Sequence, residues 1–168
     1  MVTYTNDDGL TVFYGARTVD TNVLRKVNTG AMVQEVVLSI TGADLNDTET
    51  TVNSYSVAVP SGAYIESATL IVDVLFVGAT ATMDIGTYKS DGAAIDDDGI
   101  DVAIAVGALT ADAVIACNGA QVGAVINNTA PTGSTDDGVH VRATWDTAAF
   151  TAGSARLVVK YIPNFDAS

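Results

Sequence analysis

Apolar and polar side chains alternate with a period of two along much of this chain, in short runs bounded by clusters of Gly, Asp, Asn and Pro. Successive side chains of a β-strand point to opposite faces, so the alternation predicts strands with one buried face. In residues 139–146 the row expected to face inward is Val139, Val141, Ala143 and Trp145, and the row expected to face water is His140, Arg142, Thr144 and Asp146. Residues 154–162 repeat the pattern, with an inward row of Ala155, Leu157, Val159 and Tyr161.

The same pattern predicts about ten short strands and no helix with a convincing 3.6-residue period. The expected strands are residues 10–14, 32–40, 52–59, 68–77, 79–85, 100–106, 113–117, 121–126, 139–146 and 154–162. Residues 111–117 also fit a helical turn, which is the alternative at that place. Many short strands separated by turns are typical of an all-β fold, and the predicted architecture is an antiparallel two-sheet sandwich or jelly roll with an N-terminal arm.

Composition argues against several classes of protein. The 168 residues carry 20 acidic and 7 basic side chains, which gives a net charge of −13. An acidic surface repels phosphates, so we expect neither nucleic acid nor an anionic membrane as a partner. The first residues lack the basic and apolar regions of a signal peptide, and no apolar run approaches the roughly 20 residues that span a bilayer. We therefore expect a soluble protein made in the cytoplasm.

The first thirty residues differ from the rest because Arg17, Arg25 and Lys26 supply three of the seven basic side chains. We interpret residues 1–30 as an N-terminal arm with a first short strand, and residues 31–168 as the β-sandwich domain. A cationic segment on an anionic domain orients the molecule, which makes the three basic residues candidates for contact with a carboxylate-rich partner. The alternative is that they only offset nearby acidic side chains.

The run 68–77 is apolar on both faces, beyond what a strand with one buried face needs. We expect it at the centre of a sheet, with its second face covered by a loop or by another subunit. Ile71 and Leu75 lie on that second face and are candidate subunit-interface residues.

Catalytic and cofactor-binding motifs are missing from the sequence. His140, the single histidine, lies in an outward row, and Cys117, the single cysteine, lies in an apolar run without a basic neighbour, so neither predicts an activated nucleophile or a general base. Asp96, Asp98 and Asp101 could gather a weak Ca²⁺ site, but their spacing is not that of an EF-hand, and a solvated acidic turn is the favoured interpretation. We expect no enzyme activity, no cofactor and no metal.

Three segments resemble small structural proteins of tailed bacteriophages. They are residues 6–17, which begin Asn-Asp-Asp-Gly-Leu-Thr-Val-Phe-Tyr-Gly, residues 59–72, which begin Val-Pro-Ser-Gly-Ala-Tyr-Ile, and residues 151–161, which read Thr-Ala-Gly-Ser-Ala-Arg-Leu-Val-Val-Lys-Tyr. In these segments the chain is similar to capsid decoration (cement) proteins. The resemblance implies a jelly-roll domain, usually a homotrimer, that lies on the outer surface of the virion and clamps neighbouring major capsid protein subunits. It implies no catalytic residues.

A receptor- or carbohydrate-binding module of a head fibre or tail is an alternative in the same fold class. Such a module would present an exposed aromatic side chain to its ligand, and the inward position predicted for Trp145 argues against it. A polysaccharide-degrading enzyme would need two facing carboxylates, and the sequence singles out no such pair among its 20 acidic residues. The sequence therefore favours a noncatalytic virion protein.

Overall fold

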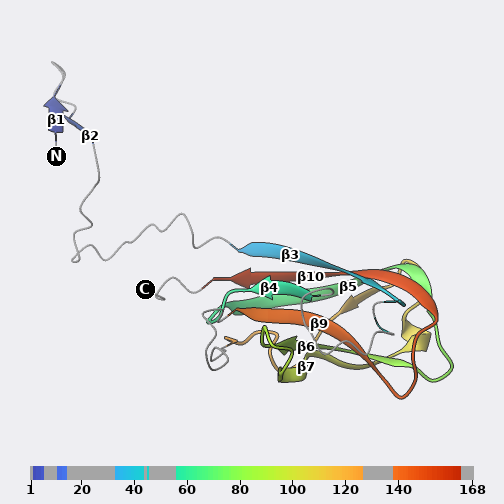
Figure 1. The fold of residues 1–168 in the computed structure, drawn as a ribbon. Helices are drawn as coiled ribbons and strands as arrows, with labels where there is room; N and C mark the ends of the chain where they lie inside the picture. The colour runs from blue at the N-terminus through green and yellow to red at the C-terminus, as the bar shows by residue number, and fades with distance from the viewer. Residues whose placement is uncertain are drawn as a thin grey trace.

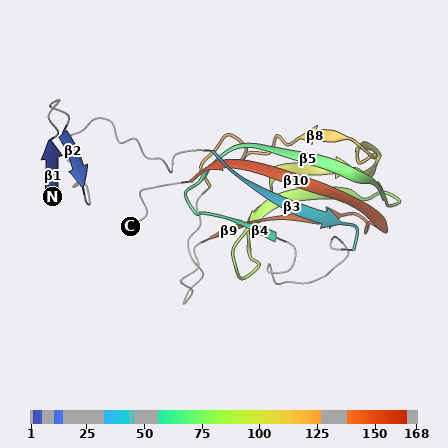
Figure 2. The same ribbon diagram turned by 90° about the horizontal axis from the view of Figure 1, so that it is seen from above.

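The computed structural model describes residues 2–5, 11–14, 33–43, 45, 56–126 and 138–163. These residues form two four-stranded antiparallel sheets packed face to face (Figure 1, Figure 2). In spatial order the strands of one sheet are β3 (Gln34–Thr41), β10 (Ala152–Ile162), β5 (Tyr64–Val77) and β8 (Val114–Ala116). Those of the other sheet are β4 (Ser56–Val59), β9 (Val139–Asp146), β6 (Thr82–Tyr88) and β7 (Ala94–Ala105). The predicted all-β, two-sheet sandwich is confirmed.

The strand pairing is nested, which identifies the sandwich as a jelly roll. Of the eight strands from β3 to β10, the first pairs with the last, β4 with β9, β5 with β8, and β6 with β7. The further pairs β10–β5 and β9–β6 join these four hairpin-like pairs into two sheets. A long hairpin folded over on itself in this way is the double Greek key of jelly-roll domains.

The core lies between the two sheets and is built from the inward rows of the strands. Its members include Leu38, Ile65, Leu70, Val72, Met83, Ile85, Val141, Leu157 and Val159, all buried. At one end of the core the rings of Phe76 and Phe150 meet edge to face, with centroids 5.3 Å apart. In β10 the predicted inward row of Ala155, Leu157, Val159 and Tyr161 is buried, which confirms its orientation.

Two further strands precede the sandwich in the sequence. β1 (Val2–Thr5) and β2 (Thr11–Tyr14) pair as a separate two-stranded antiparallel sheet. β2 corresponds to the strand predicted at residues 10–14, whereas β1 has no counterpart among the predicted strands. The division into an arm of residues 1–30 and a domain of residues 31–168 stays a prediction.

The strand predicted at residues 121–126 is wrong. These residues form turns, and Val125 alone makes an isolated β-bridge, to Tyr64. Gly123 has a φ of 84°, which interrupts extended backbone, although its N–H still donates to the Ile65 carbonyl oxygen at 2.8 Å. The helical alternative at 111–117 is also wrong, because a turn at residues 111–112 leads directly into β8.

Trp145 is more exposed than the rest of the predicted inward row of β9. Val139, Val141 and Ala143 are buried as expected, but Trp145 is 37% exposed. It occupies the penultimate position of the strand, beside the connection to β10, where the inward row reaches the end of the sandwich. The predicted row is thus confirmed, because Trp145 lies opposite the buried Met83, but the side chain is too exposed for its position to argue against a carbohydrate-binding module.

Within the described residues the helical content is slight. η2 (Val106–Ala108) is a short 3-10 helix after β7, and no helix there has the length and apolar character that crossing a bilayer requires.

Candidate functional site

The outer face of the β3-β10-β5-β8 sheet, called the β5 face below, carries apolar side chains where a solvated sheet normally carries polar ones. Strand register places Val37 opposite Val158 in one row, and Ile71 opposite both Arg156 and Val114 in the next. The exposed apolar residues of this face are Val37, Val74, Val77 and Val114, and the half-buried ones are Ile71 and Val158. The β5 face can therefore bury more apolar area against a partner.

Irregular pairing at the end of β5 explains part of this exposure. Val74 lies opposite Ser154 and Val77 opposite Ala152, so three steps along β5 match two along β10. An extra residue in one strand bends it and disturbs the alternation of its faces. Leu75, within this irregular stretch, is 47% exposed. Residues 68–77 thus have the surplus apolar surface that their sequence predicts, while the subunit interface at Ile71 and Leu75 stays a prediction.

One ion pair lies on the β5 face. The Arg156 Nη2 donates to Asp73 Oδ1 at 2.8 Å and its Nε donates to Oδ2 at 2.9 Å, so the two side chains meet in a bidentate arrangement. This hydrogen bonding holds the pKa of Asp73 below its usual range and the pKa of Arg156 above its own. Both groups are exposed, so the pair fixes side-chain geometry on the face more than it stabilises the fold.

The outer face of the second sheet is polar. A hydrogen bond of 3.2 Å joins Ser56 Oγ in β4 to His140 Nδ1 in β9. The Arg142 guanidinium carbon lies 5.6 Å from the centroid of the Tyr88 ring, within the range of a cation–π contact. Burial raises the pKa of Tyr88, against the opposing effects of a hydrogen bond to Thr144 and the Arg142 charge. His140, predicted to face outward, is half-buried and tied to the neighbouring strand.

The acidic run Asp96 to Asp98, interpreted from sequence as a solvated turn, lies inside β7, so that interpretation is wrong. Asp96 lies opposite Thr87 and Asp101 opposite Ile85, which sets four residues of β7, 97–100, against one of β6. The bulge crosses directly over Gly86, where a Cβ atom would collide with the carbonyl oxygen of Asp97. A glycine in β6 therefore makes room for the bulge.

The turn after β8 holds this bulge from its other side. Gln121 N–H donates to the Gly99 carbonyl oxygen at 2.7 Å, and Gly119 N–H donates to the Ile100 carbonyl oxygen at 2.8 Å. The Thr87 hydroxyl donates to Gln121 Oε1 at 2.8 Å. Where β7 bulges away from β6, its backbone therefore hydrogen-bonds to the turn at residues 119–121 instead, and the bulge is an ordered part of the fold.

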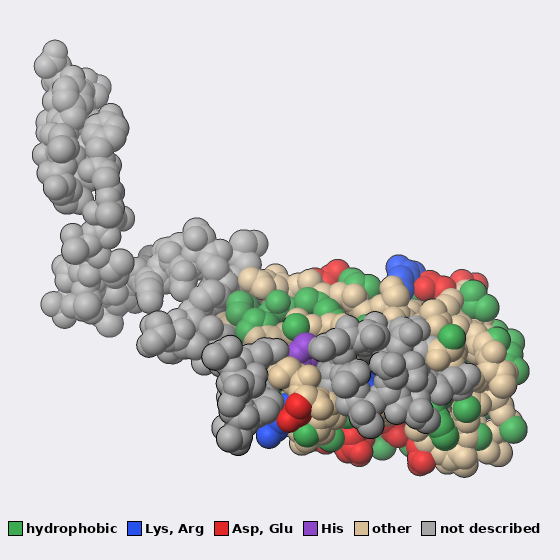
Figure 3. All heavy atoms as spheres, in the orientation of Figure 1, with side chains coloured by type: hydrophobic (Ala, Val, Ile, Leu, Met, Phe, Trp, Pro, Cys, Tyr) green, Lys and Arg blue, Asp and Glu red, His purple; other side chains and the backbone are tan. Residues whose placement is uncertain are grey.

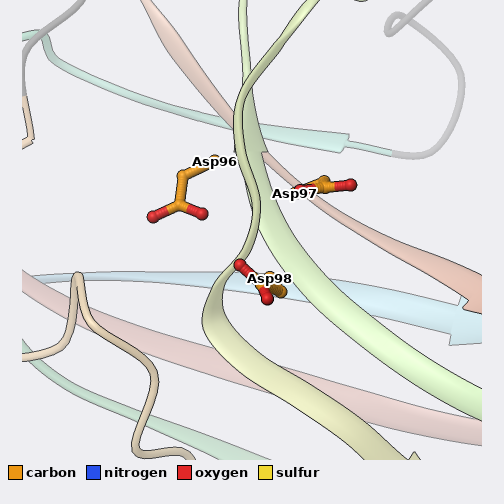
Figure 4. Close-up of side chains that lie close together, drawn as sticks. All are labelled: Asp96, Asp97 and Asp98. Atoms are coloured by element: carbon orange, nitrogen blue, oxygen red, sulfur yellow. The ribbon is translucent and has the colours of Figure 1, made fainter.

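Figure 4 shows Asp96, Asp97 and Asp98 at consecutive positions of β7, and one carboxylate oxygen from each lies within 4.8 Å of the others. Ca²⁺ takes six to eight oxygen ligands, so three carboxylates that each supply one oxygen would leave at least half of its coordination to water. Burial, a hydrogen bond with Asp98 and the charges of Asp98 and Asp97 raise the pKa of Asp96. The cluster is a site of mutual repulsion that a cation or a proton would relieve.

Asp101 does not join that cluster, contrary to the set Asp96, Asp98 and Asp101 considered from sequence. Its side chain is buried, its Oδ1 accepts from Val102 N–H at 2.9 Å, and it lies beside the Cys117 thiol. Burial and then the Asp101 charge raise the pKa of Cys117 to about 12. The interpretation of Cys117 as a small, unreactive core residue is consistent with this environment.

The three basic residues proposed for the arm, Arg17, Arg25 and Lys26, lie outside the described residues. Among described residues, the sequence reasoning missed the exposed valines Val37, Val74 and Val114 and the exposed Trp145. A signal for Val74 existed, because the strand predicted at 68–77 has too many apolar positions for one buried face. Val37 and Val114 lie in short runs of consecutive apolar residues, 36–38 and 113–117, and such short runs do not show which face of a strand is exposed.

Comparison with known proteins gives a match to the fold and none to a sequence family. No family model and no curated protein matches the chain. A solved structure titled "Capsid of Ralstonia phage GP4" contains a chain that is 18% identical, with a TM-score of 0.50, covering 83% of this chain and 90% of that one. A chain of the "Cyanophage Pam1 capsid asymmetric unit" is also 18% identical, with a TM-score of 0.49, covering 95% of this chain and 98% of that one. At 18% identity, the similarity to the Ralstonia phage GP4 chain shows a shared fold and nothing further.

Proposed function

We propose that this chain is a noncatalytic structural protein of a tailed-phage virion, made in the host cytoplasm, which decorates the outer surface of the capsid and clamps neighbouring major capsid protein subunits. The observation that carries the proposal is the jelly roll, which aligns over most of its length with a chain from the capsid of Ralstonia phage GP4. A fold by itself admits many functions. The apolar β5 face supports an assembly role in particular, because it offers surface for protein contacts.

The proposed oligomer is a homotrimer that buries part of the β5 face. Ile71 is half-buried and Leu75 exposed, and an interface of ordinary size, about 800 Å² per partner, would cover both. Ile71→Asp or Leu75→Asp would place a carboxylate in that interface, so we expect the trimer to dissociate into monomers or aggregate. Light scattering measures the mass, and Val102→Asp on β7 is the control, because Val102 is about as exposed as Leu75. A monodisperse wild-type monomer contradicts the trimer.

The proposed attachment to the capsid uses the basic arm. Arg17, Arg25 and Lys26 would face carboxylates of the major capsid protein, with the Asp-rich surface of the domain pointing away. Each exposed ion pair contributes only about 0–1 kcal/mol, so attachment depends on several contacts multiplied by the avidity of an oligomer.

Particle binding tests this attachment directly. Deletion of residues 1–27, or the combined change Arg17→Glu, Arg25→Glu and Lys26→Glu, should abolish occupancy on particles that lack the protein. The control Arg17→Lys, Arg25→Lys and Lys26→Arg keeps each charge and should bind. Circular dichroism verifies that the β-domain is folded. Normal occupancy by the triple Glu variant would defeat the electrostatic contact, and normal occupancy by the deletion would defeat the arm.

A receptor- or carbohydrate-binding module is the second candidate, and the exposed Trp145 is the observation that favours it. A partly exposed indole offers apolar area for a sugar ring, and its N–H can donate to a ligand. Binding on a glycan array that Trp145→Ala abolishes, while Val102→Ala leaves it intact, would support this candidate. An empty array for the wild-type protein would eliminate it.

A further inference from the structure

The two sheets end in four edge strands, and three of them are unsuited to pairing with another chain. β8 has three residues and β4 has four. β7 is long, but it is broken by the bulge at 97–100 and carries Asp96, Asp97, Asp98 and Asp101. Figure 3 shows acidic side chains along both long sides of the domain, with a group of hydrophobic ones near the start of β3 and the end of β10. Short length, bulges and charge are the devices that keep sheet edges from pairing.

β3 has none of these features. Its eight residues pair with β10 from Gln34 opposite Tyr161 to Thr41 opposite Ser154, without a register shift. Among the described residues, the backbone of residues 34–40 pairs with β10 alone, and no described residue pairs with their other edge. An open, regular edge presents a row of N–H and C=O groups at the spacing that a further strand needs.

The charges of β3 also favour approach by a like molecule. In a chain of net charge −13, Glu35 is the single charged residue of the strand, and Lys160 lies directly opposite it in β10. Val37, which is 48% exposed at the middle of the strand, packs beside Val158 on the β5 face. Two copies that meet at β3 therefore bring together surface of little net charge with Val37 at its centre, whereas contact at β7 would oppose two rows of carboxylates.

We infer that the open edge of β3 binds β3 of a second copy of this chain, antiparallel about a two-fold axis at Val37. Such pairing sets Glu35 of one copy opposite Ser39 of the other, and Val36 opposite Leu38. Outward side chains then meet outward ones and inward side chains meet inward ones, and no carboxylate faces a carboxylate. The two four-stranded sheets become one eight-stranded sheet, and the contact is self-complementary and closed.

This contact goes beyond the proposed function, because it uses an edge, whereas the proposed trimer uses the β5 face. Its test therefore needs only the purified full-length chain and no particle. In an antiparallel pair, directly opposed Cα atoms lie about 4.5–5.5 Å apart, which is within reach of a disulfide. Cys117 is buried, so an introduced cysteine is the one accessible thiol.

Oxidative cross-linking tests the register. We expect Val37→Cys to cross-link to itself, and Glu35→Cys and Ser39→Cys to cross-link more than tenfold faster when mixed than either does alone. Val102→Cys, of matched exposure on β7, should not cross-link. Val37→Asp sets two carboxylates face to face at an exposed position, so it should shift the β3-linked species to half its mass in sedimentation velocity without changing the circular dichroism. Cross-linking of Val102→Cys as fast as of Val37→Cys, or an association state unchanged by Val37→Asp, would overturn the inference.

Discussion

At the scale of single residues, the reactivity of Cys117 reports on solvent access to the core next to β8. Burial and the Asp101 charge raise its pKa to about 12, so at pH 8 the thiolate is on the order of 1,000-fold rarer than for a free cysteine. A disulfide reagent such as DTNB should therefore leave the folded protein unmodified for hours and react within seconds in denaturant. Modification of the native protein at the rate of a free thiol would contradict the buried placement.

Ionisation of Asp96 in the acidic bulge lowers the stability of the folded state. Its pKa is raised, chiefly by burial and by Asp98, so the folded state binds a proton more tightly than the unfolded state does. The contribution of this group to stability is thus fully present below the ordinary pKa of about 3.9 and is lost as the pH rises through the raised value. Asp96→Asn removes the charge, and we expect it to raise the unfolding free energy at pH 7 by about 0.5 kcal/mol.

Chemical denaturation at pH 4 and pH 7 measures this effect. The gain from Asp96→Asn should be smaller at pH 4, where more of the wild-type carboxyl is protonated. Glu66→Gln, an exposed carboxyl on β5 outside the cluster, is the control and should change stability little at either pH. An Asp96→Asn variant less stable than the wild type at pH 7 would show that the carboxylate has a stabilising partner.

At the scale of strands, the β6–β7 pair depends on Gly86. A Cβ atom there would collide with backbone carbonyl oxygens of the bulge, at Asp96 and Asp97, and backbone cannot move aside as a flexible side chain can. We expect Gly86→Ala to cost about 3 kcal/mol of stability, the range of severe overpacking. Gly107→Ala is the matched control, because a Cβ at Gly107 meets nothing within 4 Å. Thermal unfolding compares them, and equal stabilities would mean that the bulge does not lie against Gly86.

The strands that the sequence predicts best are those with local alternation and a regular partner. β9 and β10 match their predicted ranges closely, because each alternates between buried and exposed positions nearly throughout. β7 begins six residues before its prediction at residue 100, since an Asp-Asp-Asp-Gly run has the composition of a turn. It is extended because Gly86 and the backbone of Gln121 lie beside it, and neither neighbour is visible from the run itself.

The candidate site divides along the same line. Surplus apolar residues in 68–77 are countable in the sequence, so exposed surface on β5 could be predicted. The sequence could not predict which acidic residues come together. In the structure, Asp101 lies beside Cys117, and Asp97 joins Asp96 and Asp98. The sequence could not predict the edge position of β3 either, because that position depends on the order of strands in the sheet, which long-range pairing sets.

At the scale of the whole molecule, net charge bears on both proposed contacts, the one between copies and the one with a capsid. With a net charge of −13, two copies repel at distances up to the Debye length, about 10 Å at 0.1 M salt. The proposed contacts between copies, at the β5 face and the β3 edge, would be largely apolar or backbone in kind, so salt would remove repulsion there and little attraction. A contact between basic arm residues and capsid carboxylates is attractive, and salt weakens it.

The two kinds of contact should therefore respond to salt with opposite signs. Between about 0.05 and 0.5 M NaCl, we expect self-association to strengthen in sedimentation experiments, while occupancy on capsids through Arg17, Arg25 and Lys26 falls. The charge-preserving variant Arg17→Lys, Arg25→Lys and Lys26→Arg should keep the salt dependence of occupancy, and the deletion of residues 1–27 should show no occupancy at either salt concentration. Replacing NaCl by KCl at equal ionic strength should change neither result, because screening depends on ionic strength. Self-association that weakens as salt rises would show that ion pairs between copies, rather than apolar and backbone contacts, hold the oligomer together.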